Sequence, residues 1–132
     1  NRDMRLGHIQ QEMMLLNAAG EAVVRCWQRI EMKFSGVGLD YFVVMPNHMH
    51  GIVILQDTTA VNIPTLVQWF KTISTREYIH GVKHHGWAAF EHRLWQRSYH
   101  DHIIRNDPDL HRLREYICNN PVRWQEDRFY RL

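Results

Sequence analysis

Two histidines flank a single methionine in the segment His48-Met49-His50, which directly follows the turn-forming pair Pro46-Asn47. Side chains two residues apart on a strand project from the same face, so both imidazoles would point in one direction. Imidazole is a good ligand for divalent transition ions, and such an ion can polarise a phosphoryl oxygen. The spacing therefore predicts a metal site at the end of a sheet. Hydrogen-bonded structural histidines are the alternative interpretation of the same spacing.

A tyrosine and an asparagine lie one helical turn apart at the end of the last predicted helix. Tyr116 and Asn120 border the apolar stripe of that helix, which is formed by Leu110, Leu113 and Ile117. A phenol becomes a nucleophile toward phosphorus when a nearby cation activates the phosphate, and an amide oxygen is a weaker third metal ligand. We therefore predict that the phenol and the amide face one shared cleft. Packing of the tyrosine on the sheet, and helix termination by the asparagine before a proline, are the structural alternatives.

The first half of the chain predicts a strand or hairpin, one helix and a second hairpin. Residues 7–16 form the first of these, and Asn17 is placed to cap a helix that continues to about residue 34. The run of β-branched and aromatic residues at 41–45 predicts a buried strand. Residues 48–55 predict its antiparallel partner after a tight turn.

The second half predicts two helices separated by a strand. Pro64 sits at a favoured first helical position, which opens a helix to about Ile79. Residues 81–86 predict a loop, and residues 94–104 predict a strand. A last helix covers roughly 109–119, because the residue before a proline is pushed out of the helical region. Together the elements predict an α+β fold in which helices pack on a mainly antiparallel sheet.

Composition points to one compact domain over residues 1–132. A hydrophobic share of 45% with five tryptophans is enough for a core in a chain of 132 residues. No segment approaches the ~18 apolar residues of a membrane span, and no leader pattern is visible, so we expect a cytoplasmic protein without a membrane partner. Asn1 is not an initiator methionine, so we expect the sequence to begin inside a longer natural protein or after processing. Cys26 and Cys118 are expected to be reduced thiols.

The net charge of +2 is too small to indicate a nucleic-acid partner by itself. Basic residues become frequent after Lys71, however, so the second half of the chain could carry a surface that contacts phosphates. Ordinary solvated charge is the alternative, because acidic residues are interspersed. We expect His84, His85 and His92 to be solvated. The candidate phosphate contacts are Lys71, Arg76, Arg97 and Arg105, and the candidate base-stacking residues are Trp69, Trp95 and Tyr99. Packing in the core is the alternative interpretation of Trp69, because tryptophan at helical spacing usually belongs to the core.

Three segments in this order resemble the REP-associated branch of the single-tyrosine HUH transposases. The first runs from Phe42 to Ile54 and contains the His-hydrophobic-His strand. The second runs from Leu94 to Arg105, and the third, from Arg114 to Pro121, contains the tyrosine helix that ends in Asn-Asn-Pro. A joint match of three segments is far more specific than any one of them.

The resemblance implies a ferredoxin-like HUH nuclease sandwich that cleaves and rejoins single-stranded DNA next to imperfect REP-type hairpins. Tyr116 would form a 5′-phosphotyrosine link, and His48, His50 and Asn120 would bind Mg²⁺ or Mn²⁺. His102 would serve either as a DNA contact or as a structural hydrogen-bonding group. Family members usually open with a strand before the position of Gly7, and this chain lacks that run, so the sheet is expected to be incomplete there.

Two other functions stay open at this point. One is a catalytically silent or truncated hairpin-DNA-binding protein, which the missing opening strand favours and the intact Tyr116 with both histidines disfavours. The other is a metal-dependent hydrolase of small phosphoesters in which Tyr116 is structural. The sequence also leaves open whether the protein works alone or as a homodimer.

Overall fold

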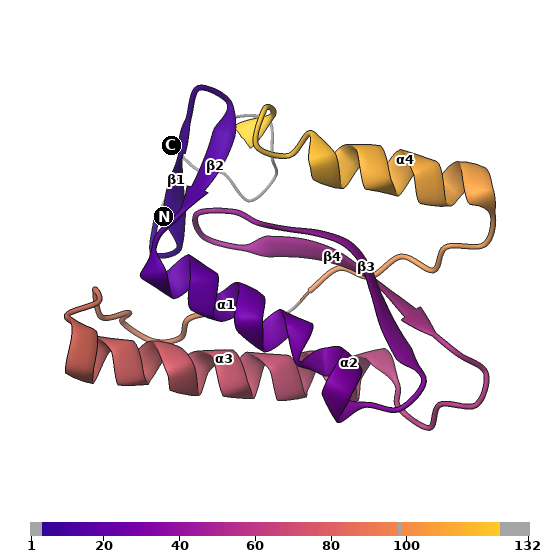
Figure 1. Cartoon of the computed structure of the whole chain (residues 1–132), viewed down its shortest axis with the longest axis horizontal. Coiled ribbons are helices and arrows are strands. Elements are labelled where there is room, and N and C mark those ends of the chain that lie inside the picture. The colour runs from indigo at the N-terminus through magenta and orange to yellow at the C-terminus, as the bar shows by residue number, and fades with distance from the viewer. Residues whose placement is uncertain (1–3, 98, 125–132) are drawn as a thin grey trace.

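The computed structural model describes residues 4–97 and 99–124 and has the predicted α+β character. In chain order the elements are β1 (Gly7–Gln10), β2 (Met13–Leu16), α1 (Ala18–Gln28), α2 (Ile30–Lys33), β3 (Val37–Val44), β4 (Met49–Leu55), α3 (Ile63–His85) and α4 (Asp107–Cys118). The strands form two separate antiparallel pairs, β1 with β2 and β3 with β4. Figure 1 shows α1 and α3 side by side on one side of the β3–β4 hairpin, with α4 on the other side.

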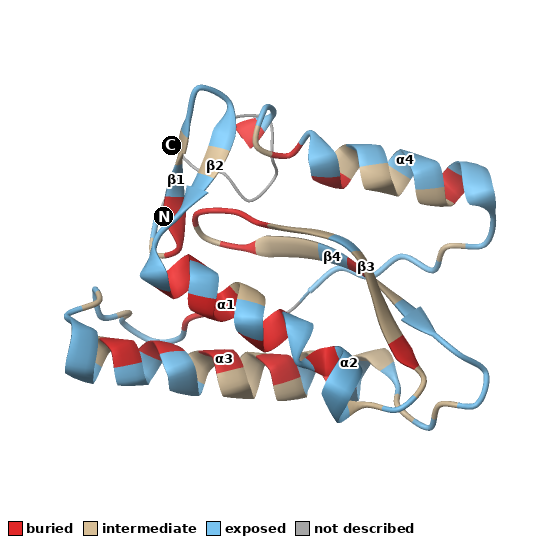
Figure 2. Cartoon of the chain, viewed as in Figure 1, coloured by how far each residue is buried: buried red, intermediate tan, exposed pale blue. Residues whose placement is uncertain are grey.

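The hydrophobic core lies between the β3–β4 hairpin and the layer of α1 and α3, as the buried residues of Figure 2 show. The ring of Trp27 on α1 lies 6.3 Å from that of Phe42 and 5.1 Å from that of Phe70. Gly51 of β4 has no side chain beneath this indole, and a Cβ built there would lie 2.6 Å from the Trp27 ring. A glycine next to His50 thus lets a helix pack closely on the strand that carries the histidines.

The turn that leads into β4 is held from two sides. The backbone N–H of Met45 donates to the carbonyl oxygen of His48 over 2.8 Å, which closes the turn. The N–H of Leu6, which is only 1% exposed, donates to the carbonyl oxygen of Pro46 over 3.1 Å. The buried Leu6, directly before β1, therefore helps to fix the position from which His48 leads into β4.

A β-bulge interrupts β3 on its way to the turn. Pairing with β4 is regular up to Leu39 and resumes at Phe42, so Asp40 and Tyr41 together face the single residue Ile52. The N–H of Tyr41 donates to the Asp40 carboxylate over 2.8 Å. A bulge of this kind re-aims side chains, and here it brings the carboxylate within reach of α4.

The helices occur in the predicted order, but two of them differ from the predicted lengths. Asn17 caps α1 by accepting from the N–H of Gly20, as predicted, but the helix is interrupted at Arg29 and resumes as the short α2. The predicted loop at 81–86 is wrong, because α3 continues to His85 and ends at Gly86 with φ +73°. Gly81 stays helical because the Trp87 ring occupies the place that a side chain would take.

The predicted strand at 94–104 is also wrong, because none of its described residues pairs with a strand. Side chains of α3 hold this segment instead. The Lys71 ammonium donates to the carbonyl oxygens of Gln96 and Arg97 at 2.6 and 3.1 Å. The indole N–H of Trp95 donates to the Ser74 hydroxyl over 2.8 Å. A strand needs a neighbour, and the β3–β4 pair gains no third strand among the described residues.

No helix in the described part of the chain combines the length and the apolar character that a membrane crossing requires.

Candidate active site

Four aromatic side chains meet on the side of the β3–β4 hairpin that faces α4. The ring centroids of His48 and His50 are 5.0 Å apart, which confirms that the two imidazoles share one face. The Tyr116 ring of α4 lies 5.3 Å from His50. The Trp124 indole is stacked on His48, with the centroids 6.0 Å apart and the planes 13° from parallel. The structure thus brings the predicted histidines and tyrosine together from two elements that lie far apart in the sequence.

His48 is a buried and oriented residue. Its side chain is held through Nδ1, which lies 2.7 Å from the Asn47 Oδ1 and donates to it when that nitrogen carries the proton. The residue is 6% exposed, with the Trp124 ring on one of its faces. A histidine that binds a metal through one ring nitrogen typically donates a hydrogen bond through the other, which fixes its tautomer. Because Nδ1 of His48 is held by Asn47, Nε2 is the nitrogen that would bind a metal.

Asn120 lies one turn past Tyr116 and is 2% exposed. Its amide N–H donates to the carbonyl oxygen of Tyr116 over 3.3 Å, a long bond that ties the residue to the end of α4. Its Oδ1 is buried and has no hydrogen-bond partner among the described residues. A buried acceptor without a partner is costly, and a cation or a donor from a bound substrate would relieve that cost.

The donor set fits one divalent ion only if Asn120 takes part. The described residues contain no group of three or more His, Cys, Asp or Glu side chains placed to hold a metal ion. Two imidazoles and one amide oxygen would leave coordination positions for phosphate oxygens and water, as a catalytic site requires.

An ion pair joins the bulge of β3 to α4, two residues before the tyrosine. The Arg114 guanidinium donates to both oxygens of Asp40 at 2.8 and 2.7 Å. The Asp40 side chain is 10% exposed and that of Arg114 is 31% exposed, so the pair is largely shielded from water. The guanidinium also lies over the Tyr41 ring, 5.1 Å from its centroid. Bidentate geometry of this kind fixes both position and orientation, so it sets where α4 presents Tyr116.

The ion pair predicts a pH-dependent contribution to stability. The hydrogen bond from Arg114 lowers the pKa of the Asp40 carboxyl, and the same bond raises the pKa of Arg114. A carboxyl with a lowered pKa in the folded protein stabilises it fully above the unfolded pKa, and this is lost as the pH falls through the folded value. Asp40→Asn should therefore lower the melting temperature by roughly 5 °C at pH 7. That difference should shrink as the pH falls through the lowered pKa of Asp40, and a pH-independent difference would contradict the prediction.

A second ionic group holds the start of α4. His102 Nε2 lies 2.7 Å from a carboxylate oxygen of Asp109, and Arg112 pairs with the other oxygen. The hydrogen bond with His102 is the main reason that the pKa of Asp109 is lowered. His102 therefore has a structural partner, whichever role it also has toward DNA.

The candidate DNA contacts fall into two groups that the structure does not bring together. Lys71 and Arg76 line a hollow on α3, on the side of the hairpin away from α4, and Arg97 lies beside Lys71. Burial lowers the pKa of Lys71, whose ammonium already binds backbone oxygens. His102 and the exposed Arg105 lie instead at the start of α4.

The candidate stacking residues differ in exposure. Trp69 packs edge-on against Phe34, and Trp95 packs against Phe70, so both are part of the core region. Tyr99 is 38% exposed, and the Lys71 ammonium lies 5.9 Å from its ring centroid.

Four further residues of the site are not predicted from the sequence. Asn47 has the sequence context of a turn residue, and its place directly before a candidate ligand is the signal for its second role. Asp40 is a carboxylate directly before the apolar run at 41–45 that predicts a strand, and Arg114 lies on the same helix as the tyrosine. Trp124 gave no signal, because it lies in a segment for which the pattern predicted no element.

Comparison with known proteins gives two levels of similarity. A family model described as "Transposase IS200 like" matches residues 13–120. A Haemophilus influenzae protein described as uncharacterized is 37% identical over 145 aligned positions, which cover 98% of this chain and 79% of that protein. A second protein of that organism, named "Putative REP-associated tyrosine transposase", is 29% identical over 83 positions, which cover 61% of this chain and 47% of that protein. No solved structure matches the chain.

Proposed function

This chain belongs to the family of IS200-like transposases, and from that premise we propose that it cleaves and rejoins single-stranded DNA through Tyr116. The observation that carries the proposal is the contact of the Tyr116 ring with His50, 5.3 Å away, beside His48. A packing tyrosine needs no polar neighbours, whereas this one contacts the imidazole of His50, which in turn contacts that of His48, and it is followed by the buried amide of Asn120. Phosphoryl transfer needs such a nucleophile next to groups that stabilise charge on the phosphate.

The proposed reaction is a transesterification. The Tyr116 Oη forms a bond to the phosphorus and the bond from phosphorus to the 3′ oxygen breaks, which leaves a 5′-phosphotyrosine and a free 3′-hydroxyl. The phenol proton passes to solvent, and the departing 3′ oxygen takes one up. Attack by another 3′-hydroxyl reverses these changes and joins a different strand. Because the phosphodiester energy is kept in the phosphotyrosine, no nucleotide cofactor is needed.

His48, His50 and Asn120 are the residues that would hold Mg²⁺ or Mn²⁺. Such an ion supplies Lewis-acid activation of the phosphate and neutralises negative charge that develops there. The protein itself orients the ligands and the nucleophile. Asn47 orients the His48 imidazole, the Trp124 ring excludes water from one face of that imidazole, and α4 positions the phenol of Tyr116.

We propose single-stranded DNA next to a hairpin as the substrate, with His102, Arg105, Lys71, Arg76 and Arg97 as candidate phosphate contacts. The two groups of basic residues lie on different sides of the hairpin β3–β4. A DNA with both a stem and a flanking single strand is large enough to reach both groups.

The test uses the purified protein, Mg²⁺ or Mn²⁺, and a hairpin oligonucleotide with single-stranded flanks that carries a label at its 3′ end. The labelled downstream piece is expected to stay on the protein in denaturant, because tyrosine retains the 5′ phosphate. Omission of the metal should remove the adduct. DNA binding without an adduct would instead support the catalytically silent hairpin-binding protein, and no DNA binding at all would overturn both functions.

A further inference from the structure

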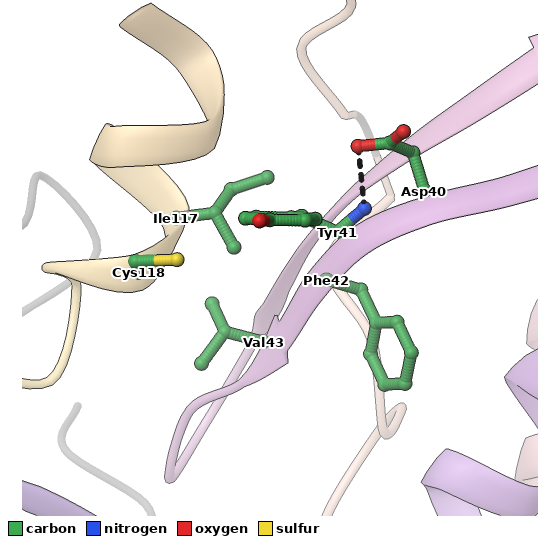
Figure 3. Close-up of a pocket in the computed structure, with 6 residues that line it drawn as sticks. All are labelled: Asp40, Tyr41, Phe42, Val43, Ile117 and Cys118. Carbon is green, nitrogen blue, oxygen red and sulfur yellow. Dashed lines mark hydrogen bonds between the residues drawn. The ribbon is translucent and has the colours of Figure 1, made fainter. Parts of the chain in front are cut away.

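A hollow of about 320 Å³ lies between β3 and the end of α4. Its lining consists of Asp40, Tyr41, Phe42, Val43, Ile117 and Cys118. Figure 3 shows the Tyr41 ring reaching from the strand toward Ile117 and Cys118, with Val43 on the same side of the strand and Phe42 turned away. This volume is about ten times the ~30 Å³ that one water molecule occupies, and it lies at the lower end of clefts that take small ligands.

The hollow adjoins the candidate active site on both of its walls. Val43 pairs directly with His50 across the hairpin, and directly opposed residues place their side chains on the same face. On the helical wall, Ile117 is the residue that follows Tyr116. A group held in the hollow is therefore next to the place where a phosphate would meet the tyrosine.

The chemistry of the hollow suits a flat and largely apolar ring. Tyr41 is 48% exposed, although it lies within the strand, and the Arg114 guanidinium covers its ring. Asp40 accepts two hydrogen bonds from that guanidinium, so the cation that covers the ring is itself held in position. Val43 and Ile117 supply aliphatic walls. An anchored aromatic face beside aliphatic walls is the arrangement on which unpaired bases stack, whatever their identity.

We propose that this hollow is a subsite for one unpaired DNA base that flanks the scissile phosphate, with the base stacked on Tyr41. The inference rests on the proposed function and adds to it a determinant of where the strand is cut. A base held here sets the register of the strand, because the neighbouring phosphodiester is then placed at Tyr116. The bulge in β3 and the Asp40–Arg114 ion pair build the subsite by fixing the ring of Tyr41.

The test is a double-mutant cycle between protein and DNA. Binding is measured by fluorescence anisotropy without divalent metal, in a Tyr116→Phe background that excludes cleavage. The DNA is a hairpin oligonucleotide selected for binding from a pool with random single-stranded flanks, with one abasic position introduced at a time. We expect one abasic position to weaken binding about tenfold. Tyr41→Ala should lower the affinity for intact DNA by a similar factor. It should not lower further the affinity for DNA that is abasic at that position.

Tyr41→Phe is the matched control, because it keeps the ring and removes only the hydroxyl, and it should bind within about twofold of the parent. Two results would overturn the subsite. In the first, the loss of affinity from Tyr41→Ala multiplies with the loss from the abasic position, whichever position is abasic; in the second, the Tyr41→Ala variant binds as well as its parent. A purely structural role of Tyr41 predicts the first of these results. The effects of the abasic position and of Tyr41→Ala can prove non-additive while the protein that keeps Tyr116 forms no adduct in the presence of metal. That result would refute the proposed cleavage and support the base subsite. Failure of every oligonucleotide to bind overturns both.

Discussion

The Tyr116→Phe variant is expected to form no covalent adduct with DNA, a loss on the order of 10³-fold or more. The change removes a single oxygen atom, which is the atom that would attack phosphorus. The ring itself stays, so its packing against His50 should be kept. The measurement is the fraction of 3′-labelled oligonucleotide that migrates with the protein in denaturing gels.

Two controls separate loss of the nucleophile from loss of the site. The affinity of Tyr116→Phe for the same hairpin should lie within about twofold of the unmodified protein, because a half-buried phenol contributes little area to DNA binding. Tyr41→Phe tests the only other described tyrosine on the α4-facing side of β3, and it should form the adduct normally. An adduct that persists in Tyr116→Phe and disappears in Tyr41→Phe would transfer the nucleophilic role to Tyr41.

The parts of the site that are predictable from the sequence depend on the periodic directions of side chains along strands and helices. Alternation along a strand places His48 and His50 on one face, and the helical repeat places Asn120 one turn after Tyr116. Both patterns are local, because they follow from backbone geometry within a few residues. The structure confirms the shared face of the two histidines by their ring contact.

The meeting of the two patterns was not deducible from local geometry. Only the resemblance to a known family implied that the phenol and the imidazoles share one site. The structure shows how the meeting is achieved, since Asp40 and Arg114 are 74 residues apart in sequence and bind through two hydrogen bonds. The bulge that makes this bond reachable depends on the pairing of two strands, and no single strand contains the information.

The two wrong elements have the same cause. The strand-like run at 94–104 predicts a strand, yet such a segment becomes one only if a neighbouring strand pairs with it. Here Lys71 and Ser74 of α3 hold the segment by hydrogen bonds instead. Gly81 predicts the end of α3 from its intrinsic preference. The packing of Trp87 over that glycine outweighs a helical penalty of about 1 kcal/mol relative to alanine.

His50→Ala is expected to lower the rate of adduct formation at saturating metal by about 10²- to 10³-fold and to shift the Mn²⁺ requirement to higher concentration. His50 is the residue between the other two rings, in contact with both His48 and Tyr116. Its loss would remove one of three proposed ligands and would also free the phenol from a neighbour that limits its position. The measurement is the adduct rate as a function of Mn²⁺ concentration, together with Mn²⁺ binding in the absence of DNA.

Asn47→Ala provides a graded comparison at the same site. It leaves all three proposed ligands in place and removes only the oxygen that holds His48 Nδ1, so the affinity for Mn²⁺ should fall by about 10- to 100-fold. Saturating metal should then restore most of its rate, whereas His50→Ala should stay slow. His111→Ala, on an exposed position of α4, is the matched control and should behave as the unmodified protein. Equal Mn²⁺ curves for all three variants would show that the imidazoles hold no catalytic ion, because an ion bound by His48 and His50 must respond to both changes.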